Sequence, residues 1–114
     1  MEKTEEFINW NDFSKIEMRV GTIVKAEIFK EAKKPAYKMS IDFGIYGIRK
    51  TSAQITKLYS PTEIIGKQVI AVINFPPKQI ANIHSECLVL GAVNEDEVTL
   101  LTTDKPIENG LRIG

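Results

Sequence analysis

The chain has 114 residues and a formal net charge of zero, and 43% of its residues are hydrophobic and 26% charged. This is the composition of an ordinary globular protein, and the length suits one domain, residues 1–114, without a second core. The single cysteine excludes a fold held together by internal disulfides.

Neither the N-terminus nor any apolar run predicts a membrane segment. The first seven residues, MEKTEEF, are acidic where a signal peptide has its apolar core. The longest purely apolar run, Val69–Ile73, is far shorter than the roughly 20 residues that cross a bilayer. We therefore expect a cytoplasmic protein that does not insert into a membrane.

The charges are distributed unevenly along the chain. Residues 1–24 contain three basic and five acidic residues, residues 25–78 contain ten and four, and residues 79–114 contain two and six. The central segment therefore has a net charge of +6 between two acidic ends. One interpretation is a solvated surface with uneven charge, and the other is an anion-binding face on a neutral protein.

Residues 1–14 are predicted to form an N-terminal extension with a short helical segment. Its aromatic residues recur every three positions: Phe7, Trp10 and Phe13. This spacing is typical of one edge of a helix, for which Asn11 or Asp12 is the expected cap. An aromatic edge on a terminal segment usually docks on the domain's own core or on a second copy of the chain.

A long strand is predicted from Ile16 to Ile28. Apolar or small residues alternate with charged ones, which is typical of a half-buried strand. The face predicted to be buried comprises Ile16, Met18, Val20, Thr22, Val24, Ala26 and Ile28. Gly21 lies within this strand and is the expected position of the bend or bulge that barrel closure requires.

Two shorter strands are predicted after a basic loop. Residues 37–43 alternate again, and the apolar positions are Tyr37, Met39, Ile41 and Phe43. The segment DFGIYG predicts a hairpin turn into a third strand at residues 48–52. Residues 56–68 contain a proline and a glycine, and they predict a helical turn or an irregular crossover.

The last third of the chain predicts further strands. Residues 69–75 show no alternation because both faces are apolar, which indicates a central strand that Pro76 and Pro77 end. Shorter strands are predicted at residues 87–93, at residues 97–104 and near the end of residues 107–114.

This order of elements predicts an all-β fold with small helical pieces. Five or more short strands, the first long and bent, with a crossover before the fourth, are typical of the OB fold, a five-stranded Greek-key barrel. A C-terminal extension is expected from about residue 100 to residue 114. OB barrels bind oligonucleotides across one sheet face and the loops that rim it.

The sequence contains no catalytic, metal-binding or cofactor-binding motif. The glycine patterns of phosphate loops, dinucleotide sites and nucleophile elbows are absent, and no paired histidine or cysteine spacing suggests zinc. His84 and Cys87 are close in sequence, but a packed thiol and a loop imidazole explain them better than a nucleophile pair. We therefore expect no enzyme activity, no metal and no cofactor.

Basic residues are the main candidates for a binding site. The candidate cations are Lys33, Lys34, Lys38, Arg49 and Lys78. The first long loop and the loop after the fourth strand rim the same face of an OB barrel, so these side chains are expected to contact RNA phosphates. Asn74 and Ser85 provide short polar groups that can reach base edges or sugar hydroxyls.

Three separate segments in this order carry a family resemblance: KIEMRVGTIVKAEIF, RKTSAQITKLY and NFPPKQIANIHSECLVLGA. They closely resemble the CsaA-type stand-alone tRNA-binding proteins, which are also described as protein-export chaperones. The match covers nearly the whole chain after about Asn11. The wider family is similar to the tRNA-binding module appended to some methionyl- and tyrosyl-tRNA synthetases. The resemblance implies a dimer of OB-fold subunits that grip structured tRNA by shape and have no catalytic activity.

The resemblance also implies individual RNA-binding residues. The positions that match the family pattern directly are Lys38, Asn74, Lys78 and Ser85. Lys34 keeps a donor where the family has a histidine, and Leu88 replaces a methionine of similar bulk. Cys87 replaces a glycine, which is expected to put a side chain where RNA backbone approaches.

Three functions stay open on the sequence alone. The first is a non-catalytic, dimeric tRNA-binding protein. The second is an export-related chaperone that holds unfolded precursor proteins in an apolar groove, for which the candidate lining is Trp10, Phe29, Phe43 or Phe75. The third is a trans-acting helper of an aminoacyl-tRNA synthetase. The aromatic N-terminal segment and the apolar tail residues Leu111 and Ile113 support dimerisation weakly.

Overall fold

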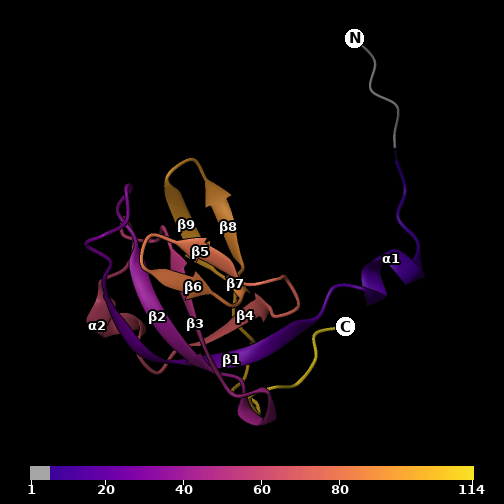
Figure 1. Cartoon of the computed structure of the whole chain (residues 1–114). Helices are drawn as coiled ribbons and strands as arrows, with labels where there is room; N and C mark the ends of the chain where they lie inside the picture. The colour runs from indigo at the N-terminus through magenta and orange to yellow at the C-terminus, as the bar shows by residue number, and fades with distance from the viewer. Residues whose placement is uncertain (1–5) are drawn as a thin grey trace.

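A five-stranded antiparallel sheet dominates the structure, a computed structural model that describes residues 6–114. In chain order the elements are α1 (Trp10–Ser14), β1 (Met18–Ile28), β2 (Tyr37–Asp42), a 3₁₀ turn (Gly44–Tyr46), β3 (Ile48–Ala53), α2 (Pro61–Ile64), β4 (Gln68–Val72), β5 (Lys78–Ile80), β6 (Ile83–Ser85), β7 (Leu88–Val89), β8 (Gly91–Asn94) and β9 (Glu97–Leu100). The sheet order is β3-β2-β1-β4-β7, and β5–β6 and β8–β9 form separate hairpins (Figure 1). The predicted all-β, OB-type barrel with small helical pieces is confirmed.

Hydrogen bonds between the segment before β7 and strand β3 close the sheet into a barrel. The Glu86 N–H donates to the Lys50 carbonyl at 2.8 Å, and the Lys50 N–H donates to the Glu86 carboxylate at 2.9 Å. Next to this pair, the Thr51 hydroxyl donates to the Cys87 carbonyl at 2.8 Å. Because β3 and β7 are the two edges of the sheet, these bonds satisfy edge groups that would otherwise be unpaired.

The predicted burial of β1 is wrong in its second half. Val20 is 1% exposed as expected, but Val24 and Ile28 are 44% and 61% exposed, and Ile23 is fully buried instead. The pairing of β1 with β2 shifts register between Ile23 and Lys25. Gly21 and Ile23 face the core before this bulge, and after it Ala26 packs against the core, because strand side chains alternate with a period of two and a bulge exchanges the two faces.

Gly21 allows close packing between side chains and β1. It is not the position of the predicted bulge, which lies farther along the strand. A Cβ atom at Gly21 would lie 2.6 Å from side-chain atoms of both Ile41 and Phe43. Both of these residues are fully buried. The missing side chain therefore leaves room for the Ile41 and Phe43 side chains to pack against β1.

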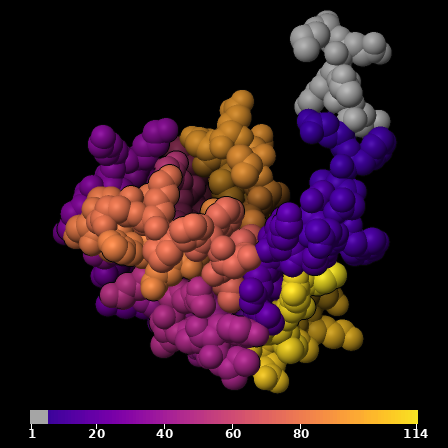
Figure 2. All heavy atoms as spheres, turned by 45° about the vertical axis from the view of Figure 1, so that its right-hand side comes forward, coloured from indigo at the N-terminus to yellow at the C-terminus, as the bar shows by residue number. Residues whose placement is uncertain are grey.

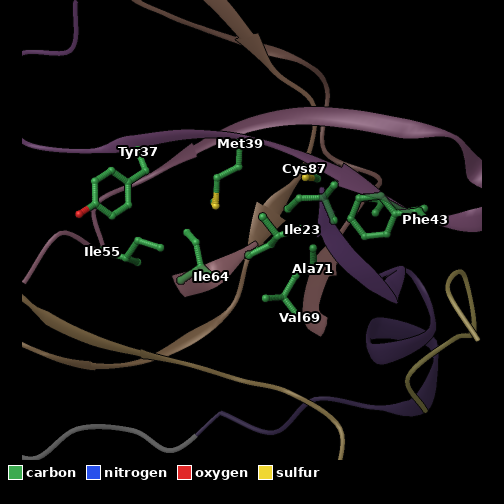
Figure 3. Packing of buried hydrophobic residues seen from close by; sticks show 11 residues of the cluster. Ile23, Tyr37, Met39, Phe43, Ile55, Ile64, Val69, Ala71 and Cys87 are labelled. Atoms are coloured by element: carbon green, nitrogen blue, oxygen red, sulfur yellow. The ribbon is translucent and has the colours of Figure 1, made fainter. Parts of the chain in front are cut away.

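The core forms from the predicted face of β2 together with β4. Residues Tyr37, Met39, Ile41 and Phe43 are all buried, and so is every residue from Val69 to Ile73. Figure 3 shows Tyr37, Met39, Phe43, Val69 and Ala71 packed with Ile23, Ile55, Ile64 and Cys87. The Tyr37 hydroxyl donates to the Tyr59 carbonyl at 2.7 Å, which satisfies its polar end at the edge of the core.

The N-terminal helix is capped by a residue that the sequence analysis did not select. The Asn9 side chain accepts from the Asp12 N–H at 2.8 Å, and the Asp12 carboxylate accepts from the Asn9 N–H at 3.1 Å. This reciprocal capping box places the cap at Asn9, so the prediction of Asn11 or Asp12 is wrong. Phe7 and Trp10 are 86% and 83% exposed, so they do not dock on the domain's own core.

The segment after β4 contains a hairpin that the sequence did not predict. Strands β5 and β6 pair through Lys78 with Ser85 and through Ile80 with Ile83. The two-residue turn between them holds Ala81 at a φ of 49°. Alanine is unfavourable in this left-handed region, which is why no turn signal was visible in the sequence.

The C-terminal extension runs back along β1. The Gly110 N–H donates to the Val20 carbonyl at 2.8 Å, and the Ile113 N–H donates to the Met18 carbonyl at 2.9 Å. In the described part of the chain, the predicted last strand is reduced to one bridge between Arg19 and Arg112. Within residues 6–114, no helix is both long enough and apolar enough to span a bilayer.

Barrel closure predicts a large effect of the substitution Thr51→Val. Thr51 is 1% exposed, so a valine removes the shorter of the two hydrogen bonds to the Cys87 carbonyl and one partner of the Ser85 hydroxyl. We expect the free energy of unfolding to fall by about 1–3 kcal/mol. Urea unfolding measures this as a lower midpoint at an unchanged slope. The control Thr99→Val changes an exposed strand position on β9, and an equal decrease in both variants would contradict the role of Thr51.

Candidate nucleic-acid interface

A groove of about 930 Å³ lies beside the two hairpins that are separate from the five-stranded sheet. Its walls are the loop after β1, the β5–β6 hairpin and the β8–β9 hairpin. The residues that line it are Glu31, Ala32, Lys33, Lys34, Ala36, Ser52, Ala53, Gln54, Ile55, Lys78, Gln79, Ile80, Ala81, Ser85, Cys87, Leu88, Val89, Leu90, Gly91, Val93, Val98 and Leu100. The groove therefore has an aliphatic floor and cations at its rim.

Three lysines reach this groove from two distant segments of the chain. Lys33 and Lys34 lie on the loop after β1, and Lys78 begins β5. All three are exposed, and none forms an ion pair within residues 6–114. Glu31 is the one carboxylate among the lining residues. Ammonium groups without an ion-pair partner around one groove are available to neutralise the phosphates of a nucleic acid.

Ser85 and Leu88 line the same groove, so five of the eight predicted RNA-binding residues come together there. Leu88 is 48% exposed and presents an apolar surface. The Ser85 hydroxyl lies 2.9 Å from the Thr51 hydroxyl and 3.3 Å from the Cys87 carbonyl that it donates to. Ser85 therefore anchors β6 to the barrel. Contact of these residues with RNA stays a prediction.

Asn74 lies outside the groove and holds the start of β1 against the end of β4. Its side-chain oxygen accepts from the Glu17 N–H at 3.0 Å, and its side-chain nitrogen donates to the Lys15 carbonyl at 2.6 Å. Both ends of the amide are therefore engaged within the chain. Each end keeps one further hydrogen-bonding position, since an amide oxygen can accept two bonds and an amide nitrogen can donate two.

Arg49 also lies apart from the groove lysines. Its guanidinium donates to the Ile73 carbonyl at 2.9 Å and is partly buried. On β3, Arg49 lies on the same side as the buried Thr51, whereas Lys50 between them is exposed. The guanidinium thus ties β3 to the end of β4. Because adjacent residues of a strand project to opposite faces, the alternation along β3 was the sequence signal that could have placed Arg49 and Lys50 on different sides of the sheet.

Lys38 lies on β2, beside a second and smaller cavity of about 110 Å³. Its ammonium is 3.6 Å from the Glu27 carboxylate and lies 5.7 Å from the centre of the Phe29 ring. Two lysines that the sequence analysis did not select, Lys25 and Lys50, line the same cavity.

Cys87 points into the core, contrary to the expectation that its side chain obstructs RNA. It is 5% exposed and packs in the central cluster, where it reaches only the floor of the groove (Figure 3). Burial raises the pKa of this thiol to about 12, so it is protonated near neutral pH and a poor nucleophile. His84 is exposed on β6.

Burial excludes two of the four aromatic residues suggested for an apolar groove. Phe29 and Phe43 are 3% and 0% exposed and belong to the interior. Trp10 and Phe75 are exposed, but neither lines the groove. The floor is aliphatic instead. Among residues 6–114, no group of three histidine, cysteine or acidic side chains could hold a metal ion.

Comparison with known proteins agrees with this architecture. A family model described as a putative tRNA binding domain matches residues 18–112. The chain belongs to this family. The matched residues run from the first residue of β1 to the bridge in the C-terminal extension, so they include the barrel and both hairpins.

Solved members of similar structure cover nearly the whole chain. The crystal structure of the chaperone CsaA from Bacillus anthracis strain Ames has a TM-score of 0.92 and 46% identity, covering 96% of this chain and 100% of that one. The CsaA chaperone protein from Picrophilus torridus has a TM-score of 0.89 and 57% identity, covering 95% and 100%. The family resemblance inferred from the three sequence segments is confirmed.

A methionine–tRNA ligase from Caldanaerobacter subterraneus subsp. tengcongensis contains a similar segment. It is 40% identical over 112 residues, which is 98% of this chain but 17% of that enzyme. The chain therefore spans about one sixth of the length of this relative. The similarity concerns one segment of the ligase and does not extend to the rest of its length.

Proposed function

We propose that this chain is a tRNA-binding protein without catalytic activity, and that the groove lysines contact the phosphates of a folded tRNA. Membership of the putative tRNA binding domain family supports the ligand class. The observation that carries the proposal is the convergence of Lys33, Lys34 and Lys78 on one groove. Phosphate neutralisation by lysine is the main source of affinity for nucleic acid.

The groove cations lie on one side, and the hairpin on the opposite side ends in an acidic turn that lies outside the groove lining. The lysines lie on the β1 loop and on β5, whereas the turn between β8 and β9 consists of Glu95 and Asp96, followed by Glu97. The acidic turn repels phosphates, so the RNA backbone is expected to follow the lysine wall. The aliphatic floor and Leu88 can then contact sugars or exposed bases.

Recognition by shape fits these groups better than readout of sequence. Lysine ammonium groups are flexible point charges that contact phosphate without base preference. The serine and asparagine candidates are engaged in bonds within the chain. A tRNA ligand also supports the cytoplasm as the expected compartment.

The first test is the salt dependence of tRNA binding. We expect the variant with Lys33, Lys34 and Lys78 all changed to Ala to bind tRNA more weakly. The log–log slope of affinity against salt should flatten by roughly 0.7–0.9 for each phosphate that no longer meets a lysine. Filter binding or gel shift over a salt series measures both quantities.

The matched control changes three exposed lysines outside the groove, Lys15, Lys67 and Lys105, to Ala. This control removes the same charge, so it should leave the slope close to that of the unaltered protein. Equal effects of the two triple variants would show that net charge alone matters. Absence of tRNA binding by the unaltered protein would refute the proposal.

A second candidate function is the holding of unfolded polypeptides, which the aliphatic groove favours. Val93 and Val98 line it from the β8–β9 hairpin, and Val93 is 74% exposed. Both solved neighbours described above are called chaperones. The third possibility, a helper of a synthetase, is supported only by the similarity to a methionine–tRNA ligase segment.

Client protection with and without tRNA separates these functions. If the groove holds polypeptide, Val93→Asp should abolish protection of a chemically denatured enzyme from aggregation, and saturating tRNA should compete with the client. The control Ile45→Asp changes a residue that is 91% exposed and outside the groove. Protection that survives both Val93→Asp and tRNA would exclude the groove as the client site.

We further propose that the chain forms a homodimer through its N- and C-terminal segments. Phe7, Ile8 and Trp10 are 86%, 74% and 83% exposed, and Leu111 is 43% exposed. The Arg112 guanidinium donates to the Ser14 carbonyl at 3.0 Å, so the two segments lie side by side, as Figure 2 shows. Large exposed apolar side chains on adjacent segments are typical of an interface between subunits.

Sedimentation velocity tests the dimer. The double substitution Phe7→Ser and Trp10→Ser should shift the protein from dimer to monomer at micromolar concentration, because the interface would be deprived of its two largest apolar side chains. Ile45→Ser is the control, since Ile45 is equally exposed on the 3₁₀ turn. A monomeric unaltered protein, or a dimer that tolerates the double substitution, would contradict this interface.

A further inference from the structure

We propose a second phosphate-binding site on the outer face of the barrel, formed by Lys25, Ser40 and Lys50. The inference rests on the proposed function and extends it, because the ligand is a phosphodiester of the same RNA. Lys25 and Lys50 are not among the residues that motif or family resemblance indicated. They are identified by their position across three neighbouring strands.

The three residues form one row across the sheet. Lys25 on β1 pairs with Ser40 on β2, and Ser40 pairs in turn with Lys50 on β3. Residues directly opposite each other on neighbouring strands project from the same face. Because strands lie about 4.8 Å apart, the two lysine Cα atoms are separated by about 10 Å. Two lysine side chains can therefore converge on one phosphate above the serine hydroxyl.

The row borders a cavity of suitable size. The cavity measures about 110 Å³ and is lined by Lys25, Glu27, Lys38, Met39, Ser40, Lys50 and Ile83. A single water needs roughly 10–15 Å³ on the same scale, so a tetrahedral oxyanion fits. The site is open to solvent, because Lys25 and Lys50 are both exposed.

The charges around this cavity favour an anion. Neither Lys25 nor Lys50 forms an ion pair within residues 6–114, and the single lining carboxylate, Glu27, is 3.6 Å from the Lys38 ammonium. The nearby Glu86 carboxylate accepts from the Lys50 backbone N–H at 2.9 Å. Two lysines facing one cavity repel each other, and a bound phosphate relieves that repulsion.

The β5–β6 hairpin lies between this site and the groove. Ile83 of the hairpin lines the cavity, whereas Lys78 and Ser85 of the same hairpin line the groove. The hairpin is only three residue pairs long. An RNA backbone that crosses it therefore meets the groove lysines on one side and the Lys25–Lys50 row on the other.

The test compares Lys25→Gln/Lys50→Gln with the control Lys67→Gln/Lys105→Gln, which removes the same charge from positions outside both cavities. With tRNA as the probe, we expect the first variant to flatten the log–log salt slope by roughly 1.4–1.8, since two lysines no longer neutralise phosphates. The control should leave the slope unchanged. Circular dichroism spectra should match for both variants.

Glu27→Gln tests the same site in the opposite direction. This change frees Lys38 from its ion pair and removes the carboxylate from the cavity. We expect tighter tRNA binding and a slope steeper by up to about 0.9, because one more cation can contact phosphate. A folding defect cannot produce tighter binding.

The outcomes distinguish the two proposals. If the groove variant with Lys33, Lys34 and Lys78 replaced weakens binding but Lys25→Gln/Lys50→Gln behaves like its control, the row is not a phosphate site and the proposed function stands. If Glu27→Gln leaves affinity unchanged, the cavity does not contact RNA. If the unaltered protein does not bind tRNA, both proposals fail.

Discussion

The hydroxyl of Thr51 joins the two edges of the sheet, and the positions of the binding surfaces depend on this contact. It is buried at 1% exposure, donates to the Cys87 carbonyl and lies within hydrogen-bonding distance of Ser85. The same contact holds β6, and therefore the β5–β6 hairpin, against β3. That hairpin carries Lys78 into the groove and separates the groove from the Lys25–Lys50 row. The hydrogen bonds that close the barrel therefore also position the residues of the binding surfaces.

A protein of zero net charge can present a strongly cationic surface if its acidic residues lie elsewhere. Here Glu95 and Asp96 occupy the tip of the β8–β9 hairpin, and Glu27 is engaged by Lys38. The groove lysines have no such partner within residues 6–114. The positive electrostatic potential that attracts phosphate is therefore confined to the groove lysines and their surroundings. The acidic turn of the β8–β9 hairpin repels phosphate, so binding is favoured on the lysine side of the groove.

Predictions of burial from alternation succeeded in strands that contain no bulge. Alternation in β2 correctly placed Tyr37, Met39 and Ile41 inside, because β2 keeps an unbroken register with β3 and the bulged residue belongs to β1. In β1 the same reasoning failed, because Gly21 and Ile23 face the core and the bulge after them changes the phase without any mark in the sequence. The β5–β6 hairpin was missed for a related reason, since its turn uses Ala81 instead of glycine.

The sequence by itself determined the all-β barrel, the family and the cationic central segment, because these follow from alternation, motif order and residue type. Only the tertiary structure decided which polar residues face a ligand. It places Lys33, Lys34 and Lys78 on one groove, but it engages Arg49 with the Ile73 carbonyl. It also pairs Lys25 with Ser40 and Ser40 with Lys50, through register between strands that are separated in the chain. Such convergence depends on long-range pairing and closure, which no local pattern of residues encodes.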